Sequence, residues 1–190
     1  MKEGDAGTPA RGKNRIDVRA IAEVGIAVAL AAVLNLVPLF KMPQGGSVSL
    51  DMLPILFLAF YRGPRLGILA GVVYGFVDYT MDPFFVHPAQ LILDYPLAFG
   101  LVGLAGFVGA GGPVKVAAGT ILGGLARFTA HFFSGVIFFA SYAPKGQSPW
   151  LYSAVYNGSY MLVSTLICIP LVYALLKAFK KSEGGLPSRP

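Results

Sequence analysis

The sequence predicts an all-α integral membrane protein, folded as a bundle of six transmembrane helices. Of its 190 residues, 55% are hydrophobic and only 13% are charged, whereas a soluble domain has about 25% charged residues. The apolar residues gather in segments, and each long one exceeds the ~20 residues that a helix needs to cross the hydrocarbon core. Because an open strand edge cannot face lipid, we expect helices to span the bilayer.

Six hydrophobic segments follow one another, at roughly residues 17–40, 49–62, 64–81, 88–110, 114–141 and 149–180. The second is short, so we expect it to be tilted, broken or buried by its neighbours. Tight Gly-Pro connectors, YRGPR and GAGGPVK, join segments on one side of the bundle. We expect residues 16–181 to form the membrane domain, between a disordered cytoplasmic N-terminal tail at 1–15 and a cytoplasmic tail at 182–190.

The basic residues predict how the bundle is oriented. Twelve of the 15 lysines and arginines fall on one side if the N-terminus is inside, and cytoplasmic loops carry this excess. We therefore expect a multi-pass protein of the plasma membrane with both termini in the cytoplasm. The net charge of +6 then reflects membrane orientation and does not indicate binding to nucleic acid.

Polar residues in the outer half of the last three segments predict a binding pocket. The stretch LILDYPLAFG places Asp94 and Tyr95 inside an apolar run, and His131, Tyr152 and Asn157 lie at similar depth. Aromatic residues, including Phe139, crowd the same layer. Ring-lined walls with one carboxylate suit a flat aromatic cation, which gains stacking, cation–π attraction and a counter-charge.

Simpler interpretations compete with a ligand site. Asp94 can be hydrated or paired with a lysine, and His131 can be a structural residue. We expect Asp78 and Asp82 to be solvated at the outer rim. Arg127 is expected to have a structural role, either snorkelling or bound to a backbone carbonyl. Glu23 is expected to contact Arg19, one helical turn earlier.

Small residues recur every four positions in the first segment, EVGIAVALAAV, and include Gly25 and Ala29. Such spacing permits close approach of helices in lipid. The pattern fits packing inside the bundle and a docking face for another membrane subunit equally well.

Several function classes lack their motifs. The sequence has no GxxxxGK[ST] phosphate loop, so it cannot bind ATP in that way. It has no HExxH motif or His/Cys cluster, and its two histidines are far apart, so we expect no metal and no cofactor. A binding pocket in a chain without an ATP-binding motif suggests a transporter subunit whose energy is supplied by partner proteins.

Several blocks resemble a known family in order along the chain: KMPQGGSVSLDMLPILFLAF, HPAQLILDYPLAFGLVGLAG, HFFSGVIFFASYAPKG and LYSAVYNGSY. They are similar to the ThiT or YuaJ family, the thiamine-specific substrate-binding (S) components of energy-coupling factor (ECF) transporters. The resemblance covers about residues 16–180. It implies a six-helix protein that binds thiamine from outside and assembles with a transmembrane coupling subunit and two cytoplasmic ATPases.

The resemblance also implies roles for particular residues. Those implied to bind the vitamin are Asp94, Tyr95, His131, Phe139, Tyr152 and Asn157. Phe139 stands where some relatives have a stacking tryptophan, which weakens any cation–π attraction. Gly25 and Ala29 match positions that contact the coupling subunit. In some relatives, an aromatic residue of the loop that covers the site contacts the vitamin. Here this loop reads Gln44-Gly45-Gly46-Ser47, so the contact of the loop with the vitamin is assigned to Phe40 or Met42.

Other hypotheses stay open. The chain can serve a different vitamin, such as riboflavin or a thiamine precursor. It can be an intramembrane enzyme that uses Asp94 and His131 as acid and base, or a structural membrane subunit without a ligand. The absence of a basic cluster in the outer half argues against thiamine phosphates as ligands.

Overall fold

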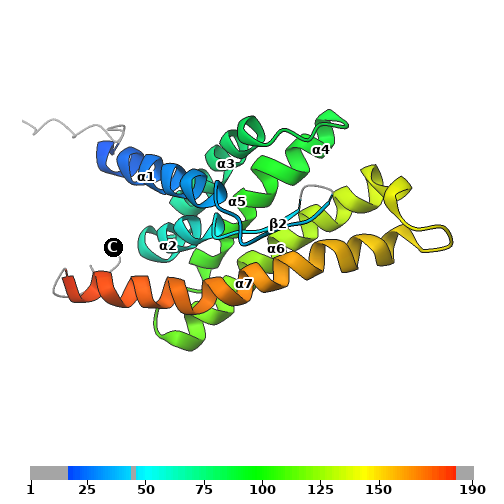
Figure 1. Ribbon diagram of the computed structural model, residues 1–190. Helices are drawn as coiled ribbons and strands as arrows, with labels where there is room; N and C mark the ends of the chain where they lie inside the picture. The colour runs from blue at the N-terminus through cyan, green and yellow to red at the C-terminus, as the bar shows by residue number, and fades with distance from the viewer. Residues whose placement is uncertain (1–16, 44–45, 183–190) are drawn as a thin grey trace, which may run out of the picture.

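The computed structural model describes residues 17–43 and 46–182, which form a membrane bundle of six helical segments (Figure 1). Five of them are α1 (Val18–Asn35), α2 (Met52–Arg62), α3 (Pro64–Met81), α6 (Pro113–Phe138) and α7 (Pro149–Ser182). The fourth helical segment, residues 88–107, consists of α4 (Pro88–Ile92), η1 (Leu93–Leu97), α5 (Ala98–Val102) and η2 (Gly103–Phe107). Four segments, α1, 88–107, α6 and α7, are long and apolar enough to cross a membrane. The predicted fold class is therefore confirmed.

The first helix ends earlier than predicted. α1 stops at Asn35, and the chain then forms a two-stranded antiparallel hairpin, β1 (Phe40–Lys41) and β2 (Ser47–Val48). Proline at position 38 explains the difference, because a proline restricts the residue before it to extended backbone and stops the helix. Apolar residues on both sides of Pro38 made the hydrophobic segment appear longer than the helix.

Glycines let α3 lie directly against the fourth helical segment. Gly67, Gly71 and Gly75 recur every four residues on one face of α3, and all three are buried. A Cβ added at Gly71 would collide with the Phe99 backbone, and one at Gly75 with the backbone around Pro96. Such small-residue faces let helix backbones touch in lipid, where dispersion forces drive association.

The fourth helical segment widens where it carries the aspartate. Leu93–Leu97 forms a π-helical turn that contains Pro96. A proline inside an α-helix clashes with the carbonyl four residues back and removes one hydrogen bond. A π-turn changes the hydrogen-bonding pattern locally, and such turns are frequent at functional sites. The residues LDYPL therefore combine a helix irregularity with the carboxylate of Asp94.

Both ends of the described chain lie at the same end of the bundle (Figure 1). Arg62 at the end of α2 pairs with Glu23 of α1 at 2.8 Å, and with Asp17, just before α1, at 3.5 Å. Near the end of α7, Phe179 packs on Phe57, with ring centroids 4.9 Å apart. The predicted Arg19–Glu23 contact is also present, at 2.9 Å. The even number of helical segments agrees with this arrangement.

Two small residues of α1, Gly25 and Ala29, do not pack inside the described bundle. Gly25 and Ala29 are exposed, and nothing lies within 4 Å of a Cβ added at Gly25. The opposite face of α1 supplies the buried residues Val24, Ala27, Val28 and Ala31. Gly25 and Ala29 therefore do not serve to pack α1 against the described part of this chain.

Candidate functional site

A cavity of about 320 Å³ lies among the hairpin and the helices at the end of the bundle away from the chain ends. This volume is at the small end of the range for ligand pockets, about 300–1,000 Å³. The hairpin, the start of α2, α3, the fourth helical segment, α6 and α7 all contribute to its walls. All six residues predicted to bind the vitamin line it: Asp94, Tyr95, His131, Phe139, Tyr152 and Asn157.

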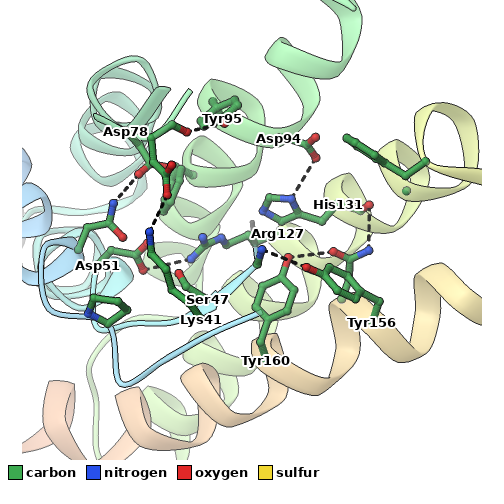
Figure 2. A pocket seen from close by; sticks show the side chains of 18 of the residues that line it. Lys41, Ser47, Asp51, Asp78, Asp94, Tyr95, Arg127, His131, Tyr156 and Tyr160 are labelled. Atoms are coloured by element: carbon green, nitrogen blue, oxygen red, sulfur yellow. Dashed lines mark hydrogen bonds and ion pairs between the residues drawn. The ribbon is translucent and has the colours of Figure 1, made fainter. Parts of the chain in front are cut away.

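Asp94 is held by three hydrogen-bond donors from two helices. Its Oδ1 lies 3.0 Å from Nδ1 of His131, and its Oδ2 accepts from Ser134 Oγ at 2.7 Å and from Gln90 Nε2 at 2.9 Å. Figure 2 shows the pair of Asp94 and His131 in the middle of the cavity wall. Both oxygens of Asp94 therefore face hydrogen-bond donors, which suits an ionised carboxylate because it only accepts hydrogen bonds. The wall therefore carries a fixed anion.

The contact with Asp94 determines which nitrogen of His131 carries the proton. An ionised carboxylate only accepts hydrogen bonds, so Nδ1–H of His131 must be the donor. In the neutral ring, Nε2 is then an acceptor. Nε2 is buried and has no hydrogen-bond partner in the part of the chain that the structure describes. The site thus offers an unused acceptor that suits an N–H donor of a ligand.

Gln90 and Tyr95 attach the connection at residues 82–87, between α3 and α4, to the site. Gln90 is buried; its Nε2 also donates to the Phe84 carbonyl at 3.1 Å, and its Oε1 accepts from Val86 N–H at 3.1 Å. The Tyr95 hydroxyl accepts from Phe84 N–H at 3.0 Å and donates to the Asp82 carbonyl at 3.1 Å. Tyr95 therefore places its hydroxyl on this connection, while its side chain lines the cavity.

Asn157 uses its amide within the protein. Its Nδ2 donates to the Ser153 carbonyl at 3.1 Å and to the His131 carbonyl at 3.3 Å, and its Oδ1 accepts from Tyr160 Oη at 2.8 Å. The amide ties α7 to α6 beside the histidine ring. In this conformation, hydrogen bonds within the protein hold the Asn157 amide beside His131.

Aromatic rings from the end of α6 and the start of α7 cover one part of the cavity. Phe139, one residue beyond α6, packs against Phe84 and Tyr142 with ring centroids 5.6 Å and 6.0 Å apart. Tyr152 and Tyr156 stack on each other at 5.8 Å on α7. Phe139, Tyr142 and both of these tyrosines of α7 line the cavity. Flat ligands gain contact area and cation–π attraction against such surfaces.

A buried ion pair lines the cavity near the start of α2. Arg127 Nη1 is 3.3 Å from Asp51 Oδ1, and the Arg127 guanidinium lies over the Phe99 ring, 4.0 Å from its centroid. The expected structural role of Arg127 agrees with this ion pair. Its partner, however, is the carboxylate of Asp51, whereas a backbone carbonyl or the membrane surface was expected. Asp51 precedes α2 directly and was not among the predicted residues.

The expectation that Asp78 and Asp82 are merely solvated is wrong for Asp78. Asp78 is only partly exposed, and its Oδ1 accepts from Asn35 Nδ2 at 2.7 Å and from Tyr74 Oη at 3.5 Å. Asp82 is exposed and pairs with Lys41 of β1 at 2.9 Å. Because α3 turns these side chains toward the hairpin, both line the cavity.

The expected single carboxylate is therefore one of several. Among the described residues, four carboxylates and two cations line the cavity: Asp51, Asp78, Asp82 and Asp94, with Lys41 and Arg127. With histidine neutral, the lining has an excess of two formal negative charges. A cationic ligand matches this excess.

The hairpin covers the cavity with residues other than those predicted. Lys41, Gly46 and Ser47 line it, whereas Phe40 and Met42 line a separate apolar groove against α7. Side chains alternate between the two faces of a strand, so Lys41 points to the side opposite from Phe40. Gly46 N–H donates to Tyr156 Oη at 3.2 Å. Gln44 and Gly45, also assigned to the lid, lie outside the described residues.

The chain is similar to known proteins over most of its length. Residues 21–183 match the model of the family described as thiamine transporter protein (Thia_YuaJ). The thiamine transporter ThiT of Bacillus subtilis is 38% identical over 161 residues, which cover 77% of this chain and 84% of the relative. The thiamine transporter ThiT of Lacticaseibacillus paracasei is 36% identical over 172 residues, covering 82% and 86%.

A solved structure agrees with the fold. ThiT from Listeria monocytogenes superimposes with a TM-score of 0.74 at 30% sequence identity, covering 86% of this chain and 96% of that one. The match spans nearly the whole of that protein, so the six-segment arrangement is common to both.

Proposed function

Since the chain belongs to the thiamine transporter family, whose members are transporters rather than enzymes, we propose that it is the high-affinity thiamine-binding component of a vitamin uptake system. The cavity is the proposed binding site. The observation that carries this proposal is the Asp94–His131 pair, which presents an anion and an unused acceptor between aromatic walls. No covalent chemistry is required of these residues.

The chemistry of thiamine matches this pair. Thiamine joins a cationic thiazolium ring to an aminopyrimidine ring through a methylene group. The amino group is a donor, and Nε2 of His131 is an acceptor without a partner among the described residues. The thiazolium charge is balanced by Asp94 and by the negative excess of the lining. Phe139, Tyr152 and Tyr156 supply surfaces on which both rings can stack.

The proposal separates residues that contact the vitamin from residues that position them. We assign direct contacts to Asp94, His131, Phe139 and Tyr152. Asn157 and Tyr95 act mainly by holding His131 and the connection at 82–87, since their polar atoms are already bound within the protein. The hairpin closes over the ligand through Lys41, Gly46 and Ser47.

Transport needs partners that supply energy. Because the sequence has no phosphate-binding loop, we assign ATP hydrolysis to two cytoplasmic ATPases, coupled through a separate transmembrane subunit as in ECF systems. The exposed small residues Gly25 and Ala29 on α1 are the proposed docking face. A helix of another protein can approach closely there.

The proposed orientation puts the cavity outside the cell. Arg19, Arg62 and Arg65 lie at the end of the bundle that also holds the basic end of α7. The cytoplasmic side carries the excess of basic residues. Both chain ends are then cytoplasmic, and the hairpin faces the extracellular solution of the plasma membrane.

Calorimetric titration of the purified protein tests the proposal. Wild type is expected to bind one thiamine without ATP, in preference to riboflavin or a free pyrimidine precursor. Tyr152→Ala should weaken binding at least tenfold, about 1.4 kcal/mol. Trp150→Ala is the matched control, because Trp150 lies two residues away on α7 and packs on Phe132, outside the cavity lining. No thiamine binding, or preference for another vitamin, would refute the assignment.

A further inference from the structure

The two faces of the hairpin differ in character. Phe40 pairs with Val48 across the strands, and Lys41 pairs with Ser47. Residues directly opposite each other in a hairpin lie on the same face, whereas neighbours along a strand lie on opposite faces. Phe40 and Val48 line the apolar groove against α7, and Lys41 and Ser47 line the cavity. The hairpin therefore separates a polar chamber from an apolar one.

The apolar groove has a volume of about 410 Å³ and lies where the hairpin runs beside α7 (Figure 1). Ser159 and Tyr160 supply hydroxyl groups to its lining, but both are bound inside the protein. Ser159 Oγ donates to the Tyr156 carbonyl, and Tyr160 Oη donates to Asn157 Oδ1, each at 2.8 Å. The described side chains of the groove therefore offer an occupant apolar contacts.

The groove lies at the depth of the lipid chains. About 20 residues of a helix cross the hydrocarbon core, so counting back from Lys177, at the basic end of α7, places residues from about 157 to 176 in it. Val163 and Ile167 of the groove fall within this range. Leu162, beside Val163, is 62% exposed on the surface of this apolar span. The groove is therefore continuous with the lipid-facing surface of α7, and its open side faces acyl chains.

Tyr160 belongs to both chambers. Its side chain lines the groove and the cavity (Figure 2). With Val48 and Met161 it forms a small apolar cluster, separate from the main core of the bundle, against which Met42 packs. A Cβ added at Gly46 would lie 2.6 Å from the Tyr160 ring, so the hairpin lies directly on this ring. The apolar packing of the hairpin is thus small, and an acyl chain in the groove would enlarge it.

We propose that an acyl chain of a phospholipid occupies the apolar groove and holds the hairpin closed, so that lipid and vitamin bind cooperatively. In the proposed orientation, this phospholipid belongs to the extracellular leaflet. The coupling to the vitamin rests on the proposed function. The acyl chain packs between Phe40 and Val163, while the vitamin lies against the opposite face of the hairpin. Both ligands favour the same position of the hairpin, so each raises the affinity for the other by the same factor.

Brominated phospholipid detects a chain in the groove, because bromine on an acyl chain quenches tryptophan fluorescence at short range. Trp150, the one tryptophan of the sequence, is first replaced by phenylalanine. Phe40→Trp then puts the indole in the groove, and Leu162→Trp puts it on the neighbouring lipid-facing surface as the matched control. The whole chain, purified in detergent, is titrated with brominated phospholipid with and without thiamine. The same titration with unbrominated phospholipid corrects for quenching by thiamine itself.

The two variants should respond differently. In the Phe40→Trp variant, quenching should saturate, as expected for a binding site. Half-saturation should need at least about fivefold less phospholipid with thiamine than without, which is the lower end of ordinary allosteric coupling. In the Leu162→Trp variant, quenching should rise in proportion to the lipid content of the micelle and should not depend on thiamine, because chains on an open surface exchange freely with detergent.

Calorimetry measures the reciprocal effect. Added phospholipid should raise the affinity of the wild-type protein for thiamine by the same factor, about fivefold or more. Val163→Phe fills the groove from α7, so phospholipid should no longer change the affinity for thiamine in this variant. Leu162→Phe adds the same ring at the neighbouring position outside the groove and should keep the response.

Four outcomes overturn the inference. The first is quenching that does not saturate in either variant, since lipid then has no preference for the groove. Weaker quenching in the Phe40→Trp variant than in the control would instead mean that protein, such as a second copy of the chain, covers the groove. Saturable lipid binding that thiamine leaves unchanged removes the coupling. These three leave the proposed function standing when the same samples bind thiamine, whereas protein that binds no thiamine refutes the proposed function and the coupling with it.

Discussion

Replacing Asp94 with asparagine should reverse the hydrogen-bonding polarity of the neighbouring histidine. Asparagine must keep its oxygen toward Ser134 and Gln90, because both donate to Oδ2 in the native site. Its NH₂ group then faces Nδ1 of His131, where the native carboxylate accepts. Two donors would meet there, so the histidine moves its proton to Nε2 and uses Nδ1 as the acceptor. The cavity wall then presents a donor where it had an acceptor.

Two separate effects determine the size of the expected loss of affinity. A thiazolium about 5 Å from the carboxylate gains about 3 kcal/mol at an effective dielectric constant of 20, and the neutral amide loses this. The reversed histidine leaves the amino group of thiamine opposite a donor, which costs about 1–3 kcal/mol. Together these effects predict a loss of thiamine affinity of about 10³–10⁴-fold.

Oxythiamine, in which oxygen replaces the pyrimidine amino group, separates the two effects. Both ligands carry the same thiazolium, so the Coulomb loss cancels in the ratio of their affinities. Wild type should prefer thiamine, and Asp94→Asn should abolish or invert the preference. Calorimetry measures the ratio, and nitrogen NMR of labelled histidine reports which ring nitrogen is protonated. An unchanged ratio with Nδ1 still protonated would refute the tautomer argument, even if both affinities fall.

Three further substitutions have expected outcomes. Gly46→Ala places a Cβ 2.6 Å from the ring of Tyr160. The hairpin or the ring must then shift, which destabilises the closed position of the hairpin by about 1–3 kcal/mol. Stopped-flow measurements should therefore show faster release of thiamine. Gly71→Leu forces α3 away from the fourth helical segment and should lower the melting temperature in detergent by more than Gly25→Leu, whose Cβ position is open. Arg127→Met leaves Asp51 buried and unpaired, which should cost about 3–5 kcal/mol of stability in chemical denaturation; equal stability would show that the pair is dispensable.

Hydropathy alone was sufficient to predict the helical segments, because a lipid-spanning chain must satisfy its backbone internally and so has few alternatives. α3, predicted at 64–81, has these bounds in the structure. The end of α1 and the hairpin after it were missed, since apolar residues continue past Asn35 while the helix does not. Hydropathy reflects how favourably side chains transfer from water into lipid. It does not indicate where a proline ends the helix.

The site was predictable only where depth in the membrane made a polar residue conspicuous. Asp94 and His131 stand out because ionisable residues within a span are rare. Asp78 lies near the end of its helix, where a carboxylate is normally solvated, and its burial depends on Asn35, 43 residues away. Gln90 is uncharged and close to an outer connection, so nothing local indicated that it holds Asp94. Long-range partners of this kind leave no pattern in the sequence.

The glycine face of α3 limits where the protein can deform. Because the backbones of α3 and the fourth helical segment touch at Gly71 and Gly75, parting them would expose peptide groups to hydrocarbon, which is costly. The hairpin is held over the cavity by an exposed ion pair, one hydrogen bond to Tyr156, and apolar packing of Met42 and Val48 against α7, and all of these contacts involve side chains. If the proposed function holds, we therefore expect thiamine to pass the hairpin, and we expect the wall that bears Asp94 to keep its position.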